Sequence, residues 1–389
     1  MLAGTLAAIA MLFAGIWLGG HPNDLPSPLR TSILESRRAQ IVTQQALNIL
    51  TRRYYRPLDR SKLVNLALSG MVAGLEDPYS HYIDPSSYAA SMNESETHMM
   101  GIGINVMHEA QGLRIVNVVE NSPAAHADLM RGDLIVKVGS VSLADRDDEF
   151  GLDLLRGPVG TTVTLTLRRG QTEHVVSLVR EEFVVPVATS RILTYHGVRI
   201  GYLRLTGFSE GSGEELRGEV RAALHIGAKG LILDLRGNGG GLIDQAINVA
   251  SIFLAHGTIM SAVERDQRRT YSALDDAIAA DTPLVLLVNH GTASSAEIVT
   301  AALQDHDRAE VVGTATYGKG VFQQTQRLVN GGALDITIGQ FFTPNGRNLG
   351  EGVHQGAGVT PNVYVPENTP AQDDEALAVA ERTVAAQVR

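Results

Sequence analysis

The chain contains no cysteine among its 389 residues. Without a thiol it can form no disulfide, use no thiolate nucleophile and build no cysteine-ligated zinc site. Positive charge is also scarce, because 32 Lys and Arg residues stand against 42 Asp and Glu residues and leave a net charge of −10. A nucleic-acid-binding protein needs a clustered basic face, so we expect no nucleic-acid partner. What the chain does have is 44% hydrophobic residues and 40 glycines, a composition that suits two or three folded domains.

Residues 1–20 carry no charged side chain and are mostly apolar. Twenty helical residues span roughly 30 Å, which is the thickness of a bilayer core. A secretory signal peptide or an uncleaved N-terminal membrane anchor is therefore expected, in preference to a buried core helix. No Lys or Arg precedes the apolar stretch and no A-x-A site follows it, so cleavage is left open. We expect a periplasmic or otherwise extracytoplasmic protein, attached to the inner membrane if this segment is retained.

A linker followed by helices is predicted for the next part of the chain. Residues 21–30 are rich in proline and lack periodicity, which is typical of a linker. From residue 31 apolar residues recur on one helical face, and a second helical run stops before Pro78, which cannot continue a helix. Residues 79–88 are interpreted as a turn-rich connector. The N-terminal helical part is therefore expected over residues 31–98.

A change to short β-like runs separated by turn residues marks residues 99–182 as a small β-rich module. Strands are expected over residues 102–107, 113–119, 134–138, 162–167 and 174–178, with one helix at 148–155. The sequence M-G-I-G-I-N-V at 100–106 is a glycine-flanked loop that leads into an edge strand. Such a loop can offer backbone N–H groups to a carboxylate, while the strand accepts an added peptide strand. Together with S-P-A-A-H-A-D-L-M-R-G-D-L-I-V-K-V at 122–138, this segment resembles a PDZ domain, in which Gly101, Ile102, Gly103 and Ile104 match the carboxylate-binding loop.

Strands and helices alternate after Pro186, which predicts βα units around a mainly parallel sheet. Strands are expected over residues 200–205, 230–235, 284–288 and 310–313, and helices over 213–224, 242–254 and 295–304. The predicted fold class is α/β, within a multidomain α+β chain. The core should cover residues 183–366, and an amphipathic helix should follow in residues 367–389.

A serine and a lysine stand in small-residue turns of this core. The sequence N-H-G-T-A-S-S-A-E at 289–297 places Ser294 after a buried strand, and Y-G-K-G-V-F-Q at 317–323 places Lys319 between two glycines. Serine is a poor nucleophile until a base removes its proton, and a lysine kept neutral by burial can be that base. Gln323 lies four positions after Lys319, a spacing that puts both side chains on one face of a helix or strand. These residues predict a Ser-Lys hydrolase.

The glycine-rich loop G-N-G-G-G at 237–241 lies between a predicted strand and a predicted helix. A phosphate-binding loop is one interpretation, but no Lys-Ser or Lys-Thr follows, and Leu242 stands where a dinucleotide-binding motif needs its last glycine. The alternative is an oxyanion hole, in which a glycine N–H points at a developing oxyanion.

Three motifs together resemble the C-terminal processing peptidases, also called tail-specific proteases. They are D-L-R-G-N-G-G-G-L-I, N-H-G-T-A-S-S-A-E-I and T-Y-G-K-G-V-F-Q, and G-M-V-A-G-L-E-D-P-Y-S-H-Y-I near residues 70–83 extends the match. The resemblance implies that Ser294 is the nucleophile, Lys319 the general base and Gln323 the residue that positions the lysine. It also implies that Gly240 and the N–H of Ser295 form the oxyanion hole, in a core of the ClpP/crotonase-like type.

The function implied by this resemblance is that of an exported serine endopeptidase whose PDZ domain captures the free C-terminus of a protein or peptide substrate. Arg156, in L-R-G-P-V-G-T, matches an arginine that couples groove occupancy to activation, although an exposed turn residue is an equal alternative. No cofactor is expected. A metal site is not expected either, because D-H-D at 305–307 lacks metal-ligand spacing. An adaptor protein, and the choice between a monomer and a homo-oligomer, are left open.

Several alternatives stay open at the level of sequence. The family commonly has S-A-S-E where this chain has S-S-A-E, which leaves Ser295 as a rival nucleophile, and it has Asn-Asn-Pro where this chain has Gly-Asn-Gly at 237–239. A Ser-His-Asp triad would use His290 or His306 with Asp305 or Asp307. Ser294 could serve only as a helix N-cap. At the level of function, the alternatives are a non-catalytic PDZ scaffold with a vestigial core and a Ser-Lys esterase or amidase.

Overall fold

The computed structural model describes residues 27–93, 98–119, 121–144, 148–265, 267–367 and 374–388. The chain divides into two compact units, Met1–Glu76 and Asp77–Arg389. The apolar segment predicted as a signal peptide or anchor lies outside the described residues. In the part of the chain that is described, no helix has the length and apolar character needed to cross a membrane.

The described part of the first unit consists of two helices, α2 (Ser27–Arg53) and α3 (Arg60–Ala73). Helix α2 begins before residue 31, so the predicted linker is wrong for residues 27–30. Proline is tolerated in the first turn of a helix because the N–H that it lacks would have no partner inside the helix. Helix α3 starts at a side-chain cap, where Asp59 Oδ1 accepts the N–H groups of Ser61 and Lys62 at 2.7 and 3.2 Å.

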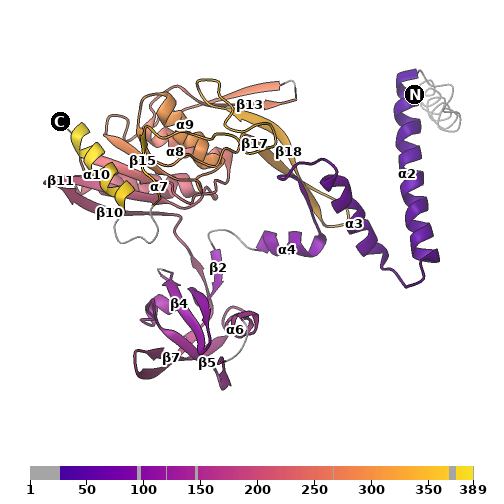
Figure 1. The fold of residues 1–389 in the computed structure, drawn as a ribbon, viewed down its shortest axis with the longest axis horizontal. Coiled ribbons are helices and arrows are strands. Elements are labelled where there is room, and N and C mark those ends of the chain that lie inside the picture. The colour runs from indigo at the N-terminus through magenta and orange to yellow at the C-terminus, as the bar shows by residue number, and fades with distance from the viewer. Residues whose placement is uncertain are drawn as a thin grey trace, which may run out of the picture. The chain divides into compact units, whose positions relative to one another are not determined.

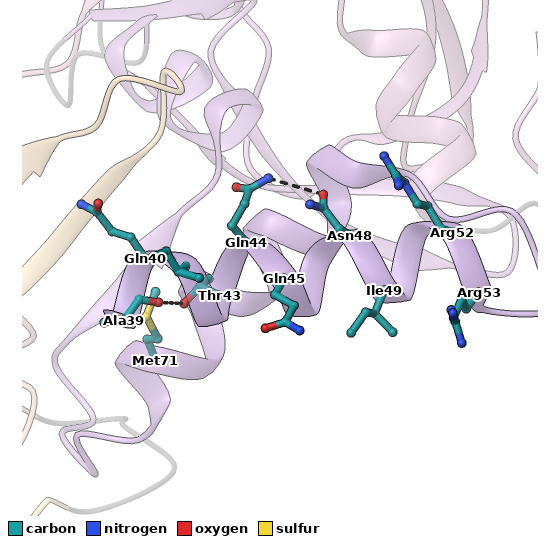
Figure 2. A pocket seen from close by; sticks show the side chains of 11 residues that line it. Ala39, Gln40, Thr43, Gln44, Gln45, Asn48, Ile49, Arg52, Arg53 and Met71 are labelled. Carbon is teal, nitrogen blue, oxygen red and sulfur yellow. Dashed lines mark hydrogen bonds between the residues drawn. The ribbon is translucent and has the colours of Figure 1, made fainter. Parts of the chain in front are cut away.

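One face of α2, together with Met71 of α3, lines an open groove of about 1060 Å³ (Figure 2). Apolar side chains are exposed in it, since Ile41, Ile49 and Met71 are 63, 49 and 62% exposed. Polar side chains alternate with them, and Gln44 donates a hydrogen bond to Asn48 across one helical turn at 3.4 Å. These two helices therefore bury little of their own apolar surface.

The second unit contains the β-rich module. Its antiparallel sheet has the order β3-β4-β5-β7-β8, and β6 pairs with β5. The elements are β3 (Ile104–Glu109), β4 (Gly112–Val118), α5 (Pro123–His126), β5 (Leu134–Val138), β6 (Val141–Ser142), α6 (Asp148–Leu155), β7 (Thr162–Arg169) and β8 (Thr172–Val179). Ile115, Ile135 and Leu165 are fully buried at its centre. Before and after it, β2 (His98–Gly101) pairs with β9 (Glu181–Val184). The strands and the helix predicted for this module are confirmed to within three residues.

The α/β core is built on a six-stranded sheet of order β10-β11-β12-β15-β16-β19. Its strands are β10 (Ala188–Tyr195), β11 (Val198–Leu205), β12 (Gly230–Asp234), β15 (Leu284–Val288), β16 (Glu310–Gly313) and β19 (Val363–Tyr364). Only the pairing of β10 with β11 is antiparallel. Its helices are α7 (Ser212–His225), α8 (Ile243–Phe253), α9 (Ser295–Asp305) and α10 (Glu375–Gln387). The predicted alternation of strands and helices is confirmed.

Helices cover both faces of this sheet (Figure 1). Leu231 and Leu233 of β12 join the apolar cluster made with α7, α8 and α9. Ile232, which points the other way, joins the cluster that contains Ala380 and Val384 of α10. Burial on both faces explains why the central strands are continuous apolar runs.

A second sheet was not predicted. It has the order β1-β18-β13-β14, with β17 paired to β18. Its strands are β1 (His81–Ile83), β13 (Thr258–Glu264), β14 (Gln267–Ser272), β17 (Val321–Arg327) and β18 (Ala333–Phe342). The interpretation of residues 79–88 as a connector is wrong, because β1 pairs with β18 and α4 (Pro85–Asn93) follows it. A three-residue strand is too short to show a period, and its partner lies about 250 residues later in the sequence.

Candidate active site

Three loops at the carboxyl ends of neighbouring parallel strands form the candidate site. The loop after β12 carries Gly240, the loop after β15 carries Ser294, and the loop after β16 carries Lys319. Because β12, β15 and β16 are adjacent, the three loops meet at one edge of the sheet. They also bind one another: the N–H of Ala293 donates to the Asn238 carbonyl, and the N–H of Tyr317 donates to the Thr292 carbonyl, each at 2.9 Å.

Ser294 occupies a strained turn between β15 and α9. Its φ is 55° and its ψ is −119°, a conformation that L-residues rarely adopt. Such a sharp turn from strand to helix lifts a serine hydroxyl out of the chain, and backbone strain of this kind concentrates at functional sites. The side chain is half-buried. In the described part of the chain, no hydrogen bond joins Ser294 Oγ to Lys319 Nζ.

Lys319 lies two residues before β17 and is half-buried. Its Nζ donates a hydrogen bond to Gln323 Oε1 at 2.7 Å, so the contact expected from their spacing is confirmed. Gln323 Nε2 in turn donates to Thr337 Oγ1 on β18 at 3.0 Å. An ammonium can only donate, so the protonated lysine requires the amide oxygen of Gln323 to face it, and Nε2 is then free to donate to Thr337.

Burial lowers the pKa of the Lys319 ammonium from its ordinary 10.5. The carboxylates of Asp335, Asp77 and Glu297 oppose this shift, but desolvation outweighs them. A lowered pKa increases the neutral fraction of the amine near neutral pH. The environment of Lys319 therefore favours the form that can accept a proton.

Glu297 is a functional residue that the sequence interpretation missed. Its side chain is fully buried. Oε2 accepts the N–H of Ser294 at 2.9 Å and the N–H of Lys319 at 3.0 Å. Oε1 accepts the N–H of Gly318 at 2.7 Å and the hydroxyl of Thr316. One carboxylate thus fixes the two turns that carry the serine and the lysine. The spacing S-x-x-E at 294–297, typical of a capping box, was the available signal.

The glycine loop packs directly against the Ser294 turn. A Cβ at Gly240 would lie 2.8 Å from Ser294 Cβ and from the Ala293 carbonyl oxygen, so only glycine fits there. Its φ of 97° also requires glycine. Buried Asn238 shapes the loop, since its Nδ2 donates to the Leu205 carbonyl and its Oδ1 accepts the N–H of Gly240, each at 2.9 Å. In this conformation the N–H of Gly240 is therefore already bonded to Asn238.

The rival residues of the sequence analysis have other partners. Ser295 is fully buried and its hydroxyl donates to the Gly241 carbonyl at 2.8 Å. His290 is exposed beside the Tyr317 ring, with a centroid distance of 5.7 Å. His306 bonds the Thr258 carbonyl at 2.7 Å. Asp305 accepts the N–H of Asn345 and the Arg347 guanidinium, while Asp307 lies in a turn after α9. None of these contacts, which lie in the described part of the chain, brings a histidine to Ser294.

The residues predicted to capture a carboxylate lie together in the β-rich module. Gly101, Ile102, Gly103 and Ile104 line one groove of about 270 Å³, and Arg156 and Phe183 also line it. A Cβ at Gly103 would lie 2.1 Å from Ser122 Cβ, so glycine is required there. Arg156 is 75% exposed in its side chain and contacts Asp153 at 3.5 Å.

Family models match three parts of the chain. Residues 199–365 match the model described as Peptidase family S41, residues 100–179 match a PDZ domain, and residues 32–87 match the N-terminal domain of the activating protease CtpB. The PDZ interpretation is thereby confirmed.

Relatives agree with these matches. A carboxy-terminal-processing protease of Bartonella bacilliformis is 35% identical over 321 residues, which are 80% of this chain and 71% of that protein. The carboxy-terminal processing protease CtpA of Bacillus subtilis is 34% identical over 313 residues, 80% of this chain and 65% of that protein. The solved structure of a photosystem II D1 C-terminal processing protease has a TM-score of 0.51 at 26% identity, covering 85% of this chain and 88% of that one. The chain thus spans about two thirds of the length of these two bacterial relatives.

The matched core and PDZ domain define the class, a serine-type peptidase with an attached PDZ domain. The sequence relationships then give the family. The chain belongs to peptidase family S41, and within it to the carboxy-terminal-processing proteases. The family predicted from the three motifs is confirmed.

The shared carboxylate gives a prediction for Glu297→Gln. If Oε2 becomes an NH₂ group, the N–H groups of Ser294 and Lys319 lose their acceptor and face another donor; if Oε1 does, the N–H of Gly318 does so and the Thr316 hydroxyl must turn to accept. An unsatisfied buried polar group costs about 1–3 kcal/mol, so the free energy of unfolding should fall by about 2–4 kcal/mol. Peptidase activity should fall about a hundredfold or more, because both turns lose their anchor. Denaturant unfolding and peptide cleavage measure the two effects. The exposed change Glu310→Gln in the same core is the control, and equal behaviour of the two variants would contradict the role of Glu297.

Proposed function

We propose that Ser294 is the nucleophile of this peptidase, that Lys319 is its general base and that Gln323 orients the lysine. The observation that carries the proposal is the 2.7 Å bond from Lys319 Nζ to Gln323 Oε1 in a site where burial lowers the lysine pKa. The shared anchor on Glu297 supports it, because it joins the backbones of the serine and lysine turns. The bond from Ser295 Oγ to Gly241 favours Ser294 over its neighbour.

The reaction follows from these roles. Neutral Lys319 Nζ takes the proton of Ser294 Oγ as that oxygen bonds to the carbonyl carbon of the scissile peptide, and the carbonyl electron pair moves to its oxygen. When the tetrahedral intermediate collapses, the C–N bond breaks and the Lys319 ammonium gives its proton to the leaving nitrogen. Water then attacks the acyl ester while Lys319 accepts a proton from it. The acid product leaves, and Ser294 regains its proton.

The N–H groups of Ser295 and Gly240 would stabilise the oxyanion in this scheme. The N–H of Ser295 stands at the first position of α9, where a helix leaves its amides without internal partners. The N–H of Gly240 must first leave Asn238 Oδ1. A glycine at position 239, where the family commonly has proline, allows that local rotation. Substrate binding would therefore complete the oxyanion hole.

The substrate class that we propose is protein tails with a free C-terminal carboxylate. The PDZ groove lined by residues 101–104 supports this, because such loops bind a terminal carboxylate through backbone N–H groups. The names of the two bacterial relatives support action near a carboxyl terminus. Arg156 stands at the rim of the same groove, where it can respond to a bound tail. A Ser-Lys esterase would have no use for this groove, and a scaffold would not need the Lys319–Gln323 contact.

We also propose that the catalytic part acts outside the cytoplasm. The uncharged, apolar residues 1–20 support this placement. An alkaline phosphatase fusion after Arg389 should be active, whereas activity of a cytoplasm-dependent reporter at that position would contradict the placement.

The dyad is tested by replacing each residue in turn. Ser294→Ala and Lys319→Ala should each lower kcat/KM about a thousandfold or more, and Lys319→Arg should not restore it, because a guanidinium stays protonated. Ser295→Ala should keep measurable turnover, since its hydroxyl bonds only a backbone carbonyl. Cleavage of a fluorogenic peptide measures these rates. An active Lys319→Ala enzyme, or an inactive but folded Ser295→Ala enzyme, would overturn the assignment.

Recognition of the tail is tested with matched peptides that end in a carboxylate or in an amide. Amidation removes the terminal charge and leaves the scissile bond unchanged. The amide should have a KM about tenfold or more above that of the acid, from loss of the charge-assisted hydrogen bonds in the groove. Replacing Gly103 by Val, which closes the loop, should reduce the difference. Equal cleavage of both peptides by the wild-type enzyme would refute tail capture.

A further inference from the structure

The turn formed by Asp77, Pro78, Tyr79 and Ser80 lies against the candidate active site. It comes directly before β1, which pairs with β18. The N–H of Thr337 on β18 donates to Ser80 Oγ at 2.9 Å. Ser80 Oγ donates to Asp77 Oδ2 at 2.6 Å, and the N–H of Tyr79 donates to Asp77 Oδ1 at 2.9 Å. The turn is therefore held both by its own carboxylate and by the strand that carries Thr337.

The aromatic ring of Tyr79 covers the end of the Lys319 side chain. Lys319 Nζ lies 4.8 Å from the ring centroid, within the range of a cation–π contact. Burial, and then the neighbouring Tyr317 hydroxyl, raise the pKa of Tyr79 above its ordinary 10, so the phenol is neutral. A neutral ring does two opposite things to the lysine. It keeps water from the amine, which favours the neutral form, and its face attracts the ammonium, which favours the charged form.

The same turn reaches Lys319 by a second route, through Thr337 and Gln323. Gln323 Oε1 accepts from Lys319 Nζ while Gln323 Nε2 donates to Thr337 Oγ1. Burial alone would raise the pKa of Asp77, but hydrogen bonds from the side chains of Ser80 and Thr337 and from the backbone outweigh it and lower that pKa. The hydrogen bonds give the route: Asp77 Oδ2 accepts the Ser80 hydroxyl, and Ser80 Oγ accepts the N–H of Thr337. The turn thus holds Thr337 where its hydroxyl oxygen accepts from Gln323 Nε2.

We propose that the turn at residues 77–80 contributes to catalysis. In this proposal Tyr79 covers the base Lys319, and Asp77, through Ser80, holds the Thr337 that orients Gln323. Tyr79, Asp77 and Thr337 are positioning residues, because they act on the lysine and not on the substrate. The inference rests on the proposed function, since it concerns the base of that mechanism.

This arrangement assigns a catalytic use to the N-terminal part of the chain. The family model of the N-terminal domain runs to residue 87 and so includes the turn, whereas Lys319 and Gln323 belong to the part matched by the peptidase model. Helix α3 ends at Ala73, and only Gly74, Leu75 and Glu76 separate it from Asp77. The base is therefore completed only when this segment pairs with β18.

Several charged or titratable groups face Lys319, and each contributes to the pKa of the lysine. Asp335 comes from β18, Asp77 from the turn and Glu297 from α9, and all three carboxylates favour the ammonium form. The Tyr79 ring contributes from the turn. Removing the ring lets water reach the amine, so the ammonium becomes more stable and the neutral fraction of Lys319 at neutral pH falls.

The contact of the Tyr79 ring with Lys319 is tested by the pH dependence of kcat/KM on a fluorogenic peptide. Tyr79→Ala should move the acid limb toward higher pH by about half a unit or more, and activity lost at neutral pH should partly return at alkaline pH. Tyr79→Phe keeps the aromatic ring, so the acid limb of its pH profile should match that of the wild-type enzyme. Should Tyr79→Ala fail to fold, Tyr79→Leu replaces it. Leucine shields the amine but has no aromatic face to attract a cation, so the limb should move toward lower pH.

Tyr82→Phe is the matched control for the Tyr79 variants. It removes a hydroxyl that accepts Asn330 Nδ2 at 2.8 Å in the same segment, and it should leave the limb unchanged. A purely structural role of Tyr79 would lower activity equally at all pH values. An unchanged limb in the folded Tyr79→Ala or Tyr79→Leu enzyme would overturn the proposal.

The second route is tested by Thr337→Val, which removes the acceptor of Gln323. We expect kcat to fall about tenfold or more with KM unchanged, and Thr337→Ser to restore it. The exposed Thr270→Val on β14 of the same sheet is the control. Equal kcat for Thr337→Val and wild type would overturn this part of the proposal. Activity in Lys319→Ala would refute the dyad itself. If Lys319→Ala is inactive but the acid limb of the pH profile is unchanged in the Tyr79 variants, only the proposed role of the turn is refuted.

Discussion

The candidate site depends on one buried carboxylate. Glu297 accepts the backbone N–H groups of Ser294 and Lys319 on the same oxygen, at 2.9 and 3.0 Å, although these residues are 25 positions apart in sequence. The bond holds Ser294 at a positive φ that its backbone alone would avoid. Burying a charged group is costly unless it is paired or hydrogen-bonded, and four donors stabilise the Glu297 carboxylate. Burial nonetheless outweighs these bonds and raises the pKa of Glu297 above its ordinary 4.5. The strain of the serine turn and the placement of the lysine turn are therefore maintained by the same interaction.

The chemistry of the site results from a balance between desolvation and charge. Three carboxylates near Lys319 would keep it protonated, and burial nonetheless lowers its pKa. Two of these carboxylates accept hydrogen bonds from other groups, which reduces their effect on the Lys319 charge. Glu297 binds backbone amides, and Asp77 binds its own turn. The lysine is left with an amide oxygen as its direct partner, which orients the amine without adding a full negative charge.

Much of this could be predicted from the sequence. The alternation of apolar strands with helices predicted the central sheet, and glycine-rich or small-residue turns after those strands predicted where Gly240, Ser294 and Lys319 would lie. The contact of Lys319 with Gln323 followed from their spacing. These predictions worked because each rests on a local pattern, such as buried strand runs or a four-residue separation.

The parts that the sequence did not predict depend on long-range pairing. Strand β1 has three residues, and its pairing with β18 places Tyr79 over Lys319, so no local pattern predicts that contact. The sequence also does not show which acceptor each backbone N–H binds. The N–H of Gly240, expected to bind an oxyanion, donates to Asn238 Oδ1 in the structure. Glu297 carried a visible capping-box spacing, but the same spacing would suit an ordinary helix start.

The proposed mechanism requires that burial keep enough of Lys319 neutral for it to act as a base. The most direct measurement is an NMR titration of the lysine side chains in Ser294→Ala enzyme labelled at lysine. The only other lysines are Lys62, Lys137 and Lys229, so the signals can be assigned by single replacements. Lys319 should titrate below its ordinary pKa of 10.5, because desolvation outweighs the surrounding carboxylates. Titration of Lys319 at or above 10.5 would contradict this mechanism.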